Sequence, residues 1–210
     1  MSPSERAALK DQLSATVAGR GDGIELDSPE WWVIGNVREP VAFFRHLGLL
    51  VPEDSILYFE GIAVGPEVAK FYETHRAIKG AVCVARDMLY PVPEIFHIQM
   101  GAGMTERLIE LVGRHSQERC FTHLKAYREG KLLFSFHDAF DRSDLLVSDR
   151  IPAERIEAFC KELGVTYRRE RNESKRNTKV LEALLRAMEN PKEIRILWPW
   201  WKKALFFWKK

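Results

Sequence analysis

The stretch at residues 121–140 reads FTHLKAYREGKLLFSFHDAF and is the clearest β-hairpin in the chain. Two runs rich in aromatic and branched residues flank Arg128-Glu129-Gly130, a pattern typical of two antiparallel strands joined by a tight turn. Further strand-like runs occur at irregular spacing, with helical periodicity between them. The sequence therefore predicts an α+β fold, a mainly antiparallel β-sheet with packed helices, followed by a C-terminal amphipathic helix.

The register of this hairpin decides which side chains share a face. A two-residue loop, Glu129-Gly130, pairs Tyr127 with Leu132 and leaves both faces a mixture of apolar and charged groups. A three-residue loop pairs Tyr127 with Lys131, separates the two kinds of side chain and gives Gly130 a left-handed conformation. We therefore predict the three-residue loop. It places on the core face Leu124, Ala126, Leu132, Phe134 and Phe136, and on the other face His123, Lys125, Tyr127, Lys131, Ser135 and His137.

The whole chain divides into a predicted body, residues 1–169, and a basic helical extension, residues 170–210. Ser2-Pro3-Ser4-Glu5 matches a helix start, so residues 3–19 are expected to form a surface helix. Pro152 and Gly164 bracket the clearest helical repeat. The other predicted strands are 30–37, 56–61, 81–87, 94–100, 145–148 and 165–169, and the other helices of the body follow Pro40, Gly65 and Thr105.

Composition narrows the class of protein. Hydrophobic residues make up 46% of the 210 positions, enough for a core, and no apolar run reaches the ~18 residues that span a bilayer. The first residues mix both charges and lack the apolar segment of a secretory signal. Cys83, Cys120 and Cys160 lie far apart without metal-site spacing, which favours reduced thiols in a cytoplasmic protein.

One face of the hairpin carries the candidate catalytic residues, His123, Ser135 and His137. In the predicted register Ser135 lies opposite His123, within reach of a base, but no strand-turn-helix elbow presents it as a nucleophile. His123 and His137 are expected to be diagonal neighbours that could share a zinc ion if His97 or an acid supplied a third ligand. No HExxH or HxH spacing supports this, so we assign no metal and no cofactor, and we expect polar sheet-face histidines.

The C-terminal end has an unusual composition. Residues 165–210 hold 13 Lys/Arg against 5 Asp/Glu, whereas the remainder has an excess of acidic residues. On a helical projection of the last residues, the lysines gather on one arc and most aromatic residues on the other, an arrangement that suits an anionic bilayer interface or a protein partner. The predicted contact residues are Trp198, Trp200, Trp201, Lys202, Lys203, Leu205, Phe207, Trp208, Lys209 and Lys210.

The leading interpretation is a non-enzymatic binding or adaptor module that attaches through this helix to an anionic membrane surface, a protein partner or a second copy. Docking of the helix on its own body remains an alternative. A small hydrolase or metal-binding enzyme that uses the face with His123, Ser135 and His137 is another. The third alternative is a nucleic-acid-binding protein that uses the basic residues 168–179. These residues lack interleaved aromatic side chains for base stacking, which argues against a nucleic-acid partner. The expected location is the cytoplasm, either free or attached peripherally to the membrane.

Overall fold

A seven-stranded antiparallel sheet forms the centre of the fold, which confirms the α+β class. The computed structural model describes residues 23–88 and 91–171. The sheet order is β3-β2-β4-β5-β6-β1-β7. The strands are β1 (Glu30–Ile34), β2 (Ile56–Gly61), β3 (Glu94–Gln99), β4 (His123–Arg128), β5 (Lys131–Phe136), β6 (Leu145–Ser148) and β7 (Tyr167–Arg171).

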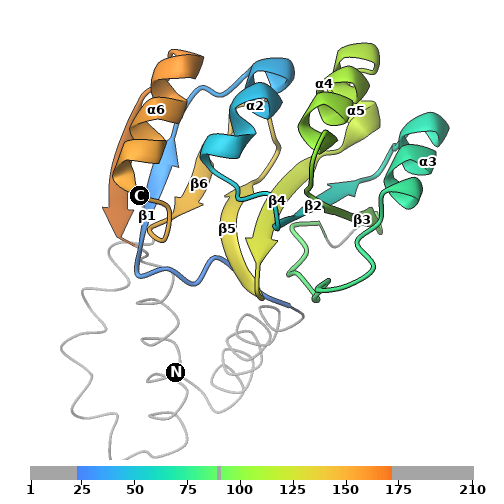
Figure 1. Ribbon diagram of the computed structural model, residues 1–210, viewed down its shortest axis with the longest axis horizontal. Coiled ribbons are helices and arrows are strands. Elements are labelled where there is room, and N and C mark those ends of the chain that lie inside the picture. Colours follow the sequence, from blue (N-terminus) through green and yellow to red (C-terminus); the bar gives the residue numbers. More distant parts are fainter. Residues whose placement is uncertain (1–22, 89–90, 172–210) are drawn as a thin grey trace, which may run out of the picture. The chain divides into compact units, whose positions relative to one another are not determined.

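The described helices lie together along one face of this sheet (Figure 1). Pro40 and Pro66 begin two of them, since proline is favoured in the first turn, where its missing N–H is not needed. Gly164, with φ of 66°, ends the last helix in the left-handed conformation, as predicted. The helical elements are α2 (Pro40–His46), the short 3-10 turn η1 (Leu47–Leu49), α3 (Pro66–Thr74), α4 (Met104–Arg114), α5 (Gln117–Cys120) and α6 (Ala153–Leu163). No helix among residues 23–88 and 91–171 is long and apolar enough to cross a membrane.

The main core lies between the helices and the sheet. It is strongly aromatic: Phe43 of α2 contacts rings from β5 and α6, and Phe44 contacts rings from β2 and the end of α5. Burying a phenylalanine side chain contributes about 1.5–3 kcal/mol. The sheet residues of this core include Leu124, Ala126, Phe134 and Phe136, which confirms the predicted core face at these four positions.

The predicted register of the central hairpin is wrong. Arg128 pairs with Lys131 and Tyr127 with Leu132, so the loop is the two residues Glu129-Gly130. Their φ values of 51° and 71° are the pair of left-handed conformations that a tight hairpin turn with the right twist requires. The next pair is Ala126 with Phe134.

A β-bulge at Leu133 reconciles this short loop with a clean core face. Leu133 has no partner on β4, so Leu132 and Leu133 point to opposite sides while the pattern resumes at Phe134. Leu133 belongs to the core beneath the helices. Leu132 instead packs with Tyr127 on the other face, so its predicted core position is incorrect.

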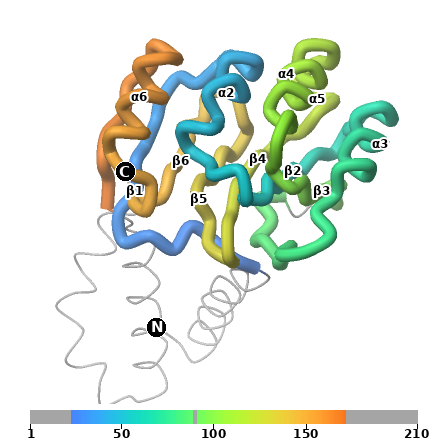
Figure 2. The backbone as a smooth tube through the Cα atoms, in the orientation of Figure 1, coloured from blue at the N-terminus to red at the C-terminus, as the bar shows by residue number. Residues whose placement is uncertain are grey.

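The helix-free face is the side of the sheet that carries Tyr58, Glu60, His123, Lys125 and Tyr127. Part of it is covered by the chain between α3 and β3, which Figure 2 shows running on the side away from the helices. Residues 81–87 were predicted as a strand but form only an isolated bridge at Val84 with Ile24. The segment therefore crosses the sheet as a cover and contributes side chains to a second, smaller cluster.

Several predicted elements lie at or beyond the limits of the described residues. The helix at 3–19 and the extension after 171 fall outside them. β7 runs to Arg171, so residues 170 and 171 pair with β1 as part of the body. The only described part of the basic stretch is therefore this edge strand, whose side chains are exposed.

Candidate functional site

A buried carboxylate on β2 organises the helix-free face. Glu60 has no solvent exposure, yet three donors satisfy it. The Tyr58 hydroxyl donates to Oε2 at 2.9 Å, the backbone N–H of Asp87 to the same oxygen at 3.1 Å, and that of Met88 to Oε1 at 2.7 Å. Burial, and then the charge of Glu60, raise the pKa of Tyr58, so its hydroxyl stays protonated and can donate. Glu60 thereby fixes the backbone on which Asp87 sits.

Asp87 has one occupied and one unoccupied carboxylate oxygen. Its Oδ1 accepts a hydrogen bond from Lys125 Nζ at 2.9 Å, and the same ammonium donates to the carbonyl of Ala85 at 2.6 Å. Lys125 is 3% exposed, so this ion pair is shielded from solvent. The other oxygen, Oδ2, is buried and has no hydrogen-bond partner among the described residues. A buried polar atom without a partner is unfavourable and marks a position where a further group can bind.

Two histidines stack beside this oxygen. The register that pairs Leu124 with Phe136 brings His137 across from His123, one step further along. Their ring centroids are 4.3 Å apart and their planes differ by 15°. Nδ1 of His137 lies 3.9 Å from Asp87 Oδ2, and Nε2 of the same ring lies 3.2 Å from Oδ2 of Asp138. The histidines are thus directly opposed, not diagonal as predicted.

The backbone at Asp138 determines which nitrogen of His123 is protonated. Asp138 has a φ of 41°, and this turn directs its N–H to His123 Nδ1 at 2.9 Å. Because an N–H can only donate, Nδ1 must be the acceptor. The proton of the neutral ring is therefore on Nε2. Burial lowers the pKa of His123. The charge of Asp87 opposes this effect and the neighbouring His137 adds to it, and the net lowering holds the His123 ring in its neutral form.

The serine of the predicted catalytic set does not join this cluster. Ser135 pairs with Lys125, not with His123 as predicted, because the shorter loop and the bulge each shift the register by one residue. Asp138 follows the end of β5, and its carboxylate lies beside both imidazoles. A Ser–His hydrolytic pair therefore has no geometric support within the described residues.

Two residues of this site were missed by sequence analysis. Asp87 was placed in a strand, and its approach to His123 is a long-range contact that no local pattern shows. Glu60 had a detectable signal: it is the one charged residue of the strand sequence ILYFEG, on the same face as Tyr58. A charge in an otherwise buried strand indicates a bound partner, since an unpaired charge is costly to bury.

The ligand geometry partly fits a metal ion. One donor atom each from Asp87, His123 and His137 can be chosen so that all three lie within 4.8 Å of one another. Two atoms bound to one ion at ~2.1 Å are at most ~4.2 Å apart. The pair Asp87 Oδ2 and His137 Nδ1, at 3.9 Å, meets this limit. The donor nitrogen of His123 must move slightly closer to the other two donor atoms. Because stacked rings direct their lone pairs in parallel planes, the His137 ring must also tilt to point at the same ion.

The thiols of the chain differ sharply in accessibility. Cys83 is exposed, whereas Cys120 and Cys160 are buried, and burial raises the pKa of each of these two to about 11. The thiolate is the reactive form, so the two buried thiols react slowly at neutral pH. We expect iodoacetamide at pH 8 to label native protein once, at Cys83, and urea-unfolded protein three times, as counted by intact mass and located by peptide mapping. Native labelling at Cys160 at a comparable rate would contradict this.

The predicted membrane or partner contacts between Trp198 and Lys210 lie outside the described residues, so they stay predictions.

The chain was also compared with protein-family models, with curated proteins and with solved structures, and none of the three comparisons found a match.

Proposed function

We propose that this protein binds a divalent first-row transition-metal ion, such as Zn²⁺, through Asp87, His123 and His137. The observation that carries the proposal is the buried Oδ2 of Asp87, which lacks a partner and faces His137 Nδ1 at 3.9 Å. Two imidazoles and one carboxylate form a donor set that suits Zn²⁺ and its neighbours more than Mg²⁺ or Ca²⁺.

The charges around the cluster favour a cation. Asp87 and Asp138 contribute two carboxylates close to the imidazoles, while among the described residues Lys125 is the one ammonium bonded to either of them, through Asp87. Lys125 occupies Oδ1 of Asp87 and leaves Oδ2 for the ion. Three protein ligands leave at least one coordination position for water, which is the arrangement of catalytic more than of structural zinc sites. His137 and Asp138 are half-exposed, so this position opens toward solvent.

Binding requires a defined local adjustment. Nδ1 of His123 is taken by the N–H of Asp138, so Nε2 is the nitrogen available to the ion. Ligation there would move the ring proton to Nδ1, so the N–H of Asp138 would have to turn away from this nitrogen. The carboxylate Oδ1 of Asp138, 3.7 Å from Nδ1, would then become the acceptor. His137 lies just beyond the end of β5 and is 54% exposed, so its ring has room to leave the stack.

The test is a metal titration of tag-free protein treated with EDTA and then exchanged into chelator-free buffer. We expect one equivalent of Zn²⁺ or Co²⁺ per chain by calorimetry and elemental analysis. His137→Ala and Asp87→Asn should each weaken binding by at least about 100-fold, because each removes a ligand, whereas losing a residue that only orients a ligand costs ~10–100-fold. His115→Ala, a change at a partly exposed histidine outside the cluster, serves as the matched control.

Wild-type protein that takes up no metal would refute the proposal. Equal affinity in wild type and His137→Ala would do so too, since an ion held elsewhere would not respond to this ring. Circular dichroism of each variant confirms that it remains folded.

The adaptor role predicted from the C-terminal helix is a separate proposal. It rests on residues after 171, and its test is cosedimentation with anionic vesicles of the full chain and of a chain lacking residues 197–210.

A further inference from the structure

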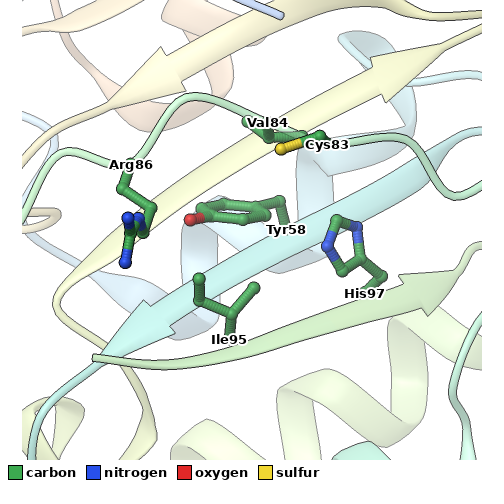
Figure 3. Close-up of a pocket in the computed structure, with 6 residues that line it drawn as sticks. All are labelled: Tyr58, Cys83, Val84, Arg86, Ile95 and His97. Carbon is green, nitrogen blue, oxygen red and sulfur yellow. The ribbon is translucent and has the colours of Figure 1, made fainter. Parts of the chain in front are cut away.

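A pocket of about 370 Å³ opens on the helix-free face, beside β3. Figure 3 shows the Tyr58 ring lying between two walls. One wall is the crossing segment, with Val84 and Cys83, and the other is β3, with Ile95 and His97. The lining is largely apolar, and Tyr58 itself is 1% exposed, so the ring belongs to the packed floor.

The polar groups of this pocket are biased toward donors. Arg86 supplies a guanidinium at one end, and none of the six lining residues is acidic. In addition to burial, the charges of two nearby carboxylates raise the pKa of Tyr58, but both groups already have donors and neither lines the pocket. Glu60 accepts from the tyrosine hydroxyl and from backbone N–H groups, and Asp87 accepts from Lys125. The Tyr58 hydroxyl is likewise occupied by its bond to Glu60. A cationic ligand would therefore find no counter-charge in the lining, whereas an anion meets Arg86.

His97 adds a second donor at the other end. The buried Tyr127 hydroxyl lies 3.4 Å from the N–H of Val82, which can only donate to it, and 2.7 Å from His97 Nδ1. The phenol oxygen could accept a second bond, but its own proton is buried and needs an acceptor, and Nδ1 is the acceptor in contact with it; we therefore assign the phenol proton to the bond with Nδ1. Nε2 then carries the imidazole proton, and Figure 3 shows the ring nitrogen remote from the His97 backbone directed into the pocket. Burial, and then the charge of Arg76, lower the pKa of His97 and keep this ring neutral.

We propose that this pocket binds a small organic carboxylate with a flat, apolar body. The guanidinium of Arg86 pairs with the carboxylate, since its planar fork matches two carboxylate oxygens. The body lies against Tyr58, Val84 and Ile95, and His97 Nε2–H donates to a second acceptor on the ligand. This site shares no lining residue with the cluster of Asp87, His123 and His137, and it does not rest on the metal proposal.

Sodium benzoate is the probe, with benzamide as a neutral and benzylamine as a cationic analogue of similar shape. Cys83 lies in the pocket wall and is exposed, so its rate of alkylation reports occupancy. We expect benzoate to bind with a Kd of about 1 mM or tighter, as seen by shifts of protein NMR resonances, and to slow alkylation of Cys83. Benzamide and benzylamine should bind at least about ten-fold more weakly, because a charge-assisted bond to arginine is lost.

Arg86→Gln removes the charge at an exposed position and should weaken benzoate binding by about ten-fold. Arg142→Gln, at another exposed arginine outside the lining, should leave it unchanged. The experiment is repeated with EDTA-treated protein and with His137→Ala, where benzoate binding should persist even if metal binding is lost. Absence of benzoate binding, equal binding of benzamide, or full affinity in Arg86→Gln would each overturn the proposal.

Discussion

Replacing Glu60 with alanine is expected to lower the free energy of unfolding by about 3 kcal/mol or more, because it removes a buried acceptor that three donors share. The change leaves three donors without their acceptor: the Tyr58 hydroxyl and the backbone N–H groups of Asp87 and Met88. Each orphaned buried donor costs about 1–3 kcal/mol. Urea unfolding, with the slope compared to wild type, measures the effect.

A graded series makes this prediction sharper. Tyr58→Phe removes one of the three donors and keeps the ring, so it should cost only about 1 kcal/mol. Glu94→Ala, at an exposed glutamate on β3, is the control and should stay within about 0.5 kcal/mol of wild type. Because Glu60 fixes the backbone of Asp87, Glu60→Ala should also weaken Zn²⁺ binding. If Glu60→Ala unfolds at the wild-type urea concentration, the carboxylate does not hold this face together.

Phe43→Ala is expected to destabilise the protein by about 3–5 kcal/mol, the range for truncating a buried phenylalanine. The ring has no solvent exposure and lies where α2, α6 and the sheet meet. Its loss removes apolar burial and leaves a cavity that surrounding rings cannot fill, because they are held by different elements. Five aromatic rings have centroids within 6.0 Å of it: Phe44, Phe134, Phe136, Phe140 and Phe159.

Thermal and urea unfolding of Phe43→Ala should agree in direction, and the control is Val92→Ala. Val92 is 74% exposed, so its truncation should change stability by no more than about 0.5 kcal/mol. Phe43→Leu should fall between the two, since it keeps most of the apolar volume. A loss under about 1 kcal/mol for Phe43→Ala would mean that the aromatic cluster is not the centre of the core. The proposed metal site lies on the other face of the sheet, so we expect the Zn²⁺ affinity per folded molecule to be unchanged.

Alternation along residues 121–140 was enough to predict the hairpin and most of its core face. Side chains in a strand point to opposite sides with a period of two, so Leu124 and Ala126 had to share a face, as did Phe134 and Phe136. The error at Leu132 arose because a bulge changes that period at one point. A three-residue loop without a bulge and a two-residue loop with one place the same four residues inward, so the pattern alone could not separate them.

The turn glycine at Gly130 and the helix bracketed by Pro152 and Gly164 followed from the sequence, because each depends on interactions between residues close along the chain. The fold class followed from the succession of strand and helix patterns, although the sheet itself pairs distant strands. The candidate site did not follow from the sequence. Asp87, which lies 36 positions before His123 in the sequence, reaches it only because the segment after α3 crosses the helix-free face and is held there by Glu60. Such contacts depend on how separate elements pack, and packing on that face does not follow from any local repeat. The hairpin was thus predicted from its own residues, and the partners of its histidines came from the folded chain.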